Sequence, residues 1–164
     1  MMLKRKKRKA RAGTILAEAA LVYPVLFLLV LAIILLGLGV FRYQQVAHAA
    51  REASRWASVH GAQYAKENSA AAATPQDVYT NAIAPHAAGM QAEGLAYTVT
   101  WNLDASGNPD KRPTRLVQTV DPATGLTRQV VVSNTVAVTV TYTWNTGLFG
   151  TLPVSSTSVN TISY

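Results

Sequence analysis

The hydrophobic positions of this sequence form one long run, then a helical repeat, and then a two-residue alternation. The run extends from Ile15 to Phe41 and contains a single ionisable side chain, that of Glu18. At a helical rise of ~1.5 Å per residue the run would be roughly 40 Å long. The hydrocarbon core of a bilayer is ~30 Å thick and needs ~20 apolar residues. The pattern predicts a transmembrane helix over residues 14–41; the alternative is a buried helix of a soluble protein.

A helical period continues beyond the apolar run, over residues 42–66. Its small and apolar side chains recur three and four positions apart, which places them on one stripe of a helix: Val46, Ala49, Ala53, Trp56 and Ala57. No proline lies between Phe41 and His60. The pattern predicts that the membrane helix continues outside the membrane and ends at Gly61 or slightly later.

The rest of the chain changes from a helical to an extended period. Residues 67–94 are predicted to form a linker and a short helix, about 75–84, with Thr74 as its cap and Pro75 at its first position. Residues 95–164 alternate apolar and polar side chains, which is typical of antiparallel strands with one wet face. The predicted strands cover 95–103, 116–120, 126–133, 135–144 and 154–163.

These elements together predict the fold class. The apolar face of the strands at 95–103 and 135–144 would pack on the helical stripe around Trp56. The predicted fold is therefore α+β, with a long N-terminal transmembrane helix that continues outside the membrane and packs on a small antiparallel sheet.

The positive charge of the chain is concentrated at one end. Seven of the fifteen Lys and Arg residues lie in residues 4–11, and the remaining eight balance all eight acids, so residues 14–164 are formally neutral. Basic residues beside a membrane span stay on the cytoplasmic side, which predicts a cytoplasmic N-terminus and an extracytoplasmic C-terminal domain. A nucleic-acid-binding arm or nuclear-localisation signal is the alternative for this tail, but the adjoining membrane span argues against a nucleic-acid partner.

Glu18 is the candidate functional residue of the apolar run. A carboxylate carried into a bilayer costs a few kcal/mol, so Glu18 either lies in the headgroup region or needs a cationic partner. Pro24 lacks a backbone N–H, and its ring clashes with the carbonyl of Ala20 in a regular helix. Pro24 is therefore predicted to bend the helix, with or without a functional consequence.

Several motifs resemble those of a known family. GTILAE, residues 13–18, resembles the type IV pilin cleavage pattern of Gly, four mostly apolar residues and Glu. AAREASRWA, residues 49–57, is similar to a segment of the TadE-like pseudopilins of tight-adherence pilus systems, and Pro24 falls where that family carries a proline. The resemblance covers residues 11 to about 60, and is architectural beyond them.

The resemblance implies a minor pseudopilin or pilus assembly subunit, single-pass in the cytoplasmic (inner) membrane, of a type IV-like pilus or secretion apparatus. It implies that residues 1–13 are a basic leader, which a prepilin peptidase removes by cutting between Gly13 and Thr14. The new amino group of one subunit would then neutralise Glu18 of a neighbour and set the axial register of the subunits. The implied partners are other pilin or pseudopilin subunits, the peptidase, an inner-membrane assembly platform and the lipid bilayer.

Two groups of residues offer weaker candidates for metal binding. His48 and Glu52 are four positions apart and could share a metal, but no second pair supplies the other ligands, and His86 stands alone too. The segment 104–110 places oxygen side chains two residues apart, as a calcium loop does. It has glycine at 107 instead of 109 and Arg115 where the last ligand belongs. A plain turn is therefore predicted, with calcium as the alternative.

The sequence contains no cysteine, Gly-rich phosphate loop, nucleophile elbow or cluster of carboxylates. We therefore predict that the protein is not an enzyme and uses no cofactor. One alternative is an uncleaved, signal-anchored protein whose extracytoplasmic domain binds another molecule. The other is an anchored enzyme, which a group of titratable side chains in a cleft would favour.

Overall fold

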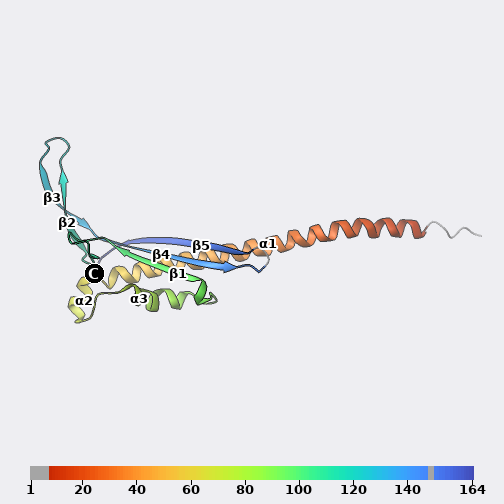
Figure 1. Cartoon of the computed structure of the whole chain (residues 1–164), viewed down its shortest axis with the longest axis horizontal. Coiled ribbons are helices and arrows are strands. Elements are labelled where there is room, and N and C mark those ends of the chain that lie inside the picture. The colour runs from red at the N-terminus through yellow and green to blue at the C-terminus, as the bar shows by residue number, and fades with distance from the viewer. Residues whose placement is uncertain (1–7, 148–149) are drawn as a thin grey trace, which may run out of the picture. The chain divides into compact units, whose positions relative to one another are not determined.

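The computed structural model describes residues 8–147 and 150–164. Residues 1–7 of the expected basic leader lie outside the described residues. The chain divides into two units, one ending at Phe41 and one comprising Arg42–Tyr164. One helix, α1 (Arg8–Val59), belongs to both units (Figure 1).

The first unit consists of the apolar part of α1. Most of the large apolar side chains between Ile15 and Phe41 are exposed, and no residue of the most apolar part of this stretch is buried. Pro24 lies inside α1, which continues through it as one helix. Exposure of so large an apolar surface to water is unfavourable, so this part of α1 needs a lipid or protein environment.

The core of the second unit lies between α1 and a three-stranded antiparallel sheet. The sheet has the order β1-β4-β5, from β1 (Leu95–Trp101), β4 (Thr135–Asn145) and β5 (Thr151–Thr161). Alternate β4 residues are buried, while the threonines between them lie on the other face. The buried set joins the small-residue stripe of α1 in one cluster: Val46, Ala50, Ala53, Ala57, Val136, Val138, Val140 and Tyr142. The predicted α+β fold and the stripe around Trp56 are confirmed.

A buried polar contact links α1 to the edge strand β5. Ser54 is fully buried, and its hydroxyl lies 2.9 Å from Ser158 Oγ. The same hydroxyl accepts a hydrogen bond of 3.0 Å from Asn160 Nδ2. Because these are among the few polar groups at an otherwise apolar interface, they fix which turn of the helix meets which residues of β5.

The helix after the membrane is shorter than predicted. It ends at Val59, and a separate helix, α2 (Ala62–Asn68), follows. The break occurs at Gly61, which is buried where the C-terminal segment and the Lys111 carbonyl come together. Ala62 N donates to Lys111 O at 2.9 Å instead of continuing the hydrogen bonds of α1. A long-range contact therefore ends the helix.

The predicted helix at 75–84 begins as expected and then changes its winding. Thr74 Oγ1 accepts from Asp77 N, and Asp77 Oδ2 accepts from Thr74 N at 2.9 Å, which is a capping box around Pro75. Only α3 (Pro75–Val78) is α-helical; η1 (Tyr79–Ile83) is a π-helix, and η2 (Ala84–His86) is a 3₁₀ turn. A further 3₁₀ turn, η3 (Ala92–Gly94), precedes β1.

The predicted hairpin forms a second, separate sheet. It contains β2 (Thr114–Val120) and β3 (Thr127–Ser133), which pair only with each other. Leu116 and Val131 lie directly opposite each other on one face, and both are exposed. The outer edge of each strand makes no ladder contact within the part of the chain that the structure describes. Two-stranded ribbons are marginal by themselves, so the loop at their base is important.

Candidate functional site

The residues singled out for processing and assembly all lie on the exposed surface of α1. Gly13, Thr14 and Glu18 are exposed, and a Cβ added at Gly13 would meet no atom within 4 Å. Thr14 and Glu18 are four positions apart on a helix, so they occupy the same face one turn apart. The structure thus brings the proposed new N-terminus and the carboxylate onto one face of the first unit. The roles of these residues in processing and assembly, and the bend expected at Pro24, remain predictions.

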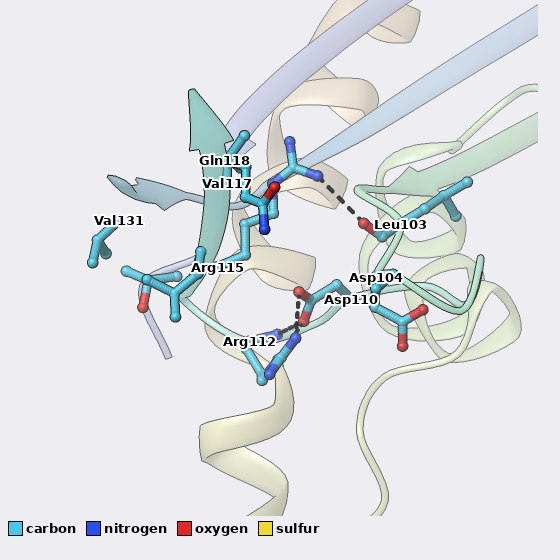
Figure 2. Close-up of a pocket in the computed structure, with 11 residues that line it drawn as sticks. Leu103, Asp104, Asp110, Arg112, Arg115, Val117, Gln118 and Val131 are labelled. Atoms are coloured by element: carbon cyan, nitrogen blue, oxygen red, sulfur yellow. Dashed lines mark hydrogen bonds and ion pairs between the residues drawn. The ribbon is translucent and has the colours of Figure 1, made fainter. Parts of the chain in front are cut away.

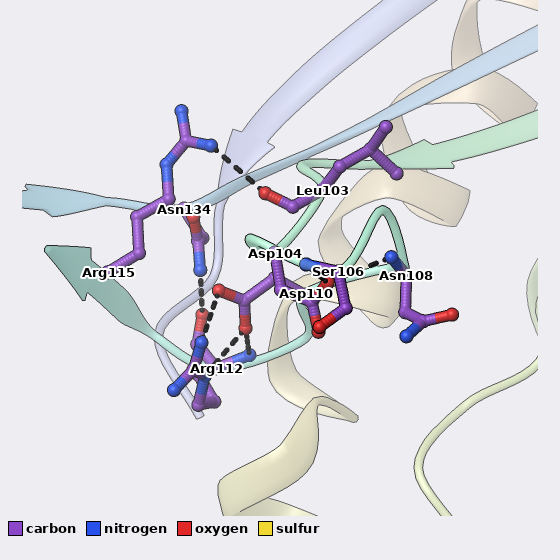
Figure 3. A network of polar contacts seen from close by, with 8 residues as sticks. All are labelled: Leu103, Asp104, Ser106, Asn108, Asp110, Arg112, Arg115 and Asn134. Atoms are coloured by element: carbon purple, nitrogen blue, oxygen red, sulfur yellow. Dashed lines mark hydrogen bonds and ion pairs between the residues drawn. The ribbon is translucent and has the colours of Figure 1, made fainter. Parts of the chain in front are cut away.

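The loop expected to be a plain turn is held by its own carboxylates (Figure 3). Asp104 Oδ1 accepts from the backbone N–H groups of Ser106 and Asn108, both at 2.9 Å. The carboxylate of Asp110 accepts from Arg112 Nε at 2.8 Å and Nη2 at 2.9 Å. Because both carboxylates already accept hydrogen bonds from the loop backbone or from Arg112, the structure favours the turn over the calcium alternative.

Asp110 is the most strongly perturbed acid of this network. It is buried, while its partner Arg112 is largely exposed. The hydrogen bond from the Arg112 side chain lowers the pKa of Asp110 to about 2, against the opposing effect of burial, and the Arg112 backbone N–H acts in the same direction. The ion pair therefore ties the 104–110 loop to the base of the hairpin.

Replacing Asp110 by Asn is expected to destabilise the protein in a pH-dependent way. Since the folded pKa of about 2 lies below the ordinary value of 3.8, the carboxylate stabilises the fold above about pH 4. This stabilisation, at most about 2 kcal/mol because Arg112 is exposed, is lost as the pH falls towards 2. Urea unfolding of the full chain in detergent, followed by tryptophan fluorescence, measures it. A loss of stability in Asp110→Asn that is as large at pH 2 as at pH 7 would contradict this assignment.

A cavity of about 510 Å³ lies between this loop and β2 (Figure 2). Residues 114–118 follow one another along its wall, so the cavity borders the unpaired edge of β2 as well as its side chains. The Arg115 guanidinium crosses the gap, and its Nη1 donates to Leu103 O at 3.3 Å. Arg115 Nε and Asn134 Oδ1 are buried without a hydrogen-bond partner.

The wall of this cavity mixes charged, polar and apolar side chains. Its lining combines Asp104, Asp110, Arg112 and Arg115 with apolar side chains, and includes no histidine, cysteine or serine. Sequence reasoning missed the cavity, because it joins a loop and a hairpin that pack through long-range contacts. A charged residue at the half-buried position 115, between exposed Thr114 and Leu116, was the available signal.

The histidines weighed as metal ligands make ring contacts instead. The rings of His48 and His86 stack with centroids 5.0 Å apart and an interplanar angle of 29°. His86 Nδ1 lies 2.9 Å from Ala82 O, which engages one ring nitrogen. Within the described ranges, no group of three or more His, Cys, Asp or Glu side chains could hold a metal ion.

The comparisons with known proteins concern the segment that carries Gly13 and Glu18. Residues 13–55 match the family model described as TadE-like protein. Over this segment the chain is similar to TadE-like proteins. The recognition made from GTILAE and AAREASRWA is confirmed. Comparison with curated proteins and with solved structures gives no match.

The TadE-like segment lies within α1. It contains the apolar stretch of α1 and extends into the stripe that packs on the sheet. Among the described residues, α1 is the one helix long and apolar enough to cross a membrane. One long apolar helix of this kind fits a single-pass membrane protein.

Proposed function

We propose that this TadE-like chain is a minor pseudopilin or pilus assembly subunit of a type IV-like pilus or secretion apparatus. One observation carries the proposal: Glu18 is the single acid of the exposed apolar stretch 15–41, inside the TadE-like segment and one turn after the proposed new N-terminus. An isolated carboxylate there is costly in lipid. A neighbouring subunit that supplies an α-amino group removes that cost.

The proposed topology follows from the charge of the two flanks. The basic leader stays in the cytoplasm, α1 spans the inner membrane once, and residues 42–164 lie outside. Anionic lipids of the inner leaflet hold the leader until the prepilin peptidase cuts between Gly13 and Thr14. The protein then docks with other pilin or pseudopilin subunits on the inner-membrane assembly platform.

The proposed role is structural and not enzymatic. In the cavity beside β2, the acids and arginines are engaged with each other or with the loop backbone. The alternative is an uncleaved, signal-anchored binding protein. It shares the membrane helix but keeps residues 1–13.

N-terminal sequencing of the membrane-extracted protein separates these two functions. Co-expression with an active prepilin peptidase should remove residues 1–13 and leave Thr14 as the first residue. Gly13→Phe, which fills the small position before the bond, should keep Met1 under the same conditions. Intact Met1 in the unaltered chain, while the same peptidase processes a second pilin, would favour the uncleaved anchor.

A further inference from the structure

A cation without an acidic partner lies where the apolar stretch of α1 ends. Arg42 follows Phe41 directly and is the first residue of the second unit. Its Nη1 donates to Gln45 Oε1 at 3.0 Å, and its Cζ lies 5.9 Å from the centroid of the Tyr142 ring. In residues 13–147 and 150–164, the one ion pair within 4.0 Å is Arg112–Asp110. The charge of Arg42 is therefore not neutralised by a carboxylate of this chain.

A small cavity opens beside this guanidinium. It has a volume of about 160 Å³ and is lined by Arg42, Gly89, Gln91, Tyr142, Trp144 and Asn145. Gly89 has a φ of +76°, and a Cβ there would lie 3.6 Å from Arg42 Nη1. The positive φ favours glycine at this position. The volume is below the ~300–1,000 Å³ of pockets for drug-sized ligands, so a group such as a phosphate fits better than a whole small molecule.

Two aromatic side chains, Tyr142 and Trp144, line this cavity. Trp144 is half-buried and lies opposite Leu152, which is exposed, near the end of the β4–β5 hairpin. The Tyr142 hydroxyl accepts a hydrogen bond from Gln91 N at 3.4 Å. Tryptophan and tyrosine rings, with one apolar and one polar end, are enriched at the headgroup level of membranes. Arginine binds phosphate through paired N–H groups.

The covalent connection of Arg42 to the apolar stretch indicates the environment of this cavity. Phe41 is the last residue of the apolar stretch, and α1 passes through residue 42 without a break. Arg42 therefore lies at the level where hydrocarbon gives way to headgroups, provided that α1 spans the membrane as proposed above. Trp144 and Asn145, near the end of the β4–β5 hairpin, line the same cavity as Arg42.

We propose that Arg42 and Trp144 form a docking surface for the lipid headgroups of the extracytoplasmic leaflet, where α1 leaves the membrane. The guanidinium binds a lipid phosphate in the small cavity, and Trp144 and Leu152 rest among the headgroups. This is a second membrane contact, to which Trp144 and Leu152 contribute although they lie far from the membrane span in sequence. It restrains the folded unit from tilting and rotating about the end of the span.

The test uses cysteine-directed spin labels, because the chain contains no native cysteine. Single cysteines replace Leu36 in the apolar stretch, Thr151 at the end of the β4–β5 hairpin and Ser106 in the distant 104–110 loop. The full chain is placed in nanodiscs of phosphatidylcholine, with or without phosphatidylglycerol. Collision of each label with oxygen, which concentrates in hydrocarbon, and with a water-soluble nickel chelate gives its depth.

The expected result is graded. The label at 36 collides with oxygen, the label at 106 with the nickel chelate, and the label at 151 is shielded from the chelate, more so with phosphatidylglycerol. A label at 36 that is open to the chelate contradicts the proposed membrane span itself. A label at 36 in hydrocarbon with a label at 151 as open as that at 106 overturns the docking surface and leaves the span intact.

Arg42→Gln tests the anion in the same discs. The share of phosphatidylglycerol that gives half of the full shielding at 151 should rise about fivefold, the factor expected for one basic residue near an anionic surface. Arg51→Gln, an exposed arginine on the same helix, is the matched control and should leave it unchanged. The proposal is overturned if the shielding at 151 does not depend on phosphatidylglycerol and increases with the number of copies per disc. That result would assign this surface to contact with another subunit.

Discussion

Glu18→Ala is expected to leave the protein inserted in the membrane and to abolish its co-assembly with partner subunits. Removing an acid from the apolar stretch cannot weaken insertion, because the charge opposes insertion. It leaves the amino group of a neighbouring Thr14 without its partner, however. Losing one member of a buried ion pair costs about 3–5 kcal/mol, which is a factor of at least about 100 in association. Co-purification of a tagged partner pilin from membranes measures the loss.

Two variants control this experiment. Glu52→Ala removes an acid from the same helix outside the apolar stretch and should co-assemble normally. Glu18→Gln keeps the shape and loses the charge, so it should fail like Glu18→Ala if charge is the decisive property. Undiminished co-assembly of Glu18→Ala, with its membrane insertion verified by carbonate extraction, would sink the proposed role of Glu18.

Gly61→Ala is expected to destabilise the second unit severely. An added Cβ would overlap Tyr164 O, and would lie 2.7 Å from Lys111 O and 3.0 Å from Ile162 Cγ2. Two of these neighbours are backbone atoms, held by the hydrogen bonds Ala62 N–Lys111 O and Tyr164 N–Ser58 O. The three segments must separate to admit a methyl group, which we expect to cost about 3 kcal/mol. Urea unfolding in detergent, followed by tryptophan fluorescence, gives the value.

Gly37→Ala is the matched control for the added methyl group. A Cβ at Gly37 meets no atom within 4 Å, so this variant should unfold at the same urea concentration as the unaltered chain. If Gly61→Ala also unfolds there, the close approach of Gly61, Lys111 and Tyr164 does not occur in the protein.

The sequence predicted those parts of the fold that depend on local periodicity. The alternation around Val138 predicted β4 and its buried face, and the spacing of Val46 and Ala53 predicted which side of α1 is covered. The cap formed by Thr74 was predictable because all its atoms lie within four residues. Patterns of this kind need no knowledge of the partner, only of the period.

The features that escaped prediction depend on contacts between distant residues. Nothing near Gly61 shows that the C-terminal segment lies against it, so the end of α1 was placed too late. The hairpin of β2 and β3 was predicted, but its separation from the main sheet was not, because the choice of strand partners is not local. The cavity around Arg115 escaped for the same reason. At Glu18 the sequence showed the cost of the charge, while the partner that offsets it belongs to another molecule.

The hydroxyl of Ser54 has a mechanical consequence. The alanines around it would allow α1 to slide along the sheet at little cost, but a slip of one turn, ~5.4 Å, would separate Ser54 from Ser158 and Asn160. If a growing fibre pulls the chain by its apolar end, the force enters the folded part as shear along α1. The hydrogen bonds of Ser54 with Ser158 and Asn160 then oppose this sliding. They should be the first contacts between helix and sheet to resist the force and the first to break.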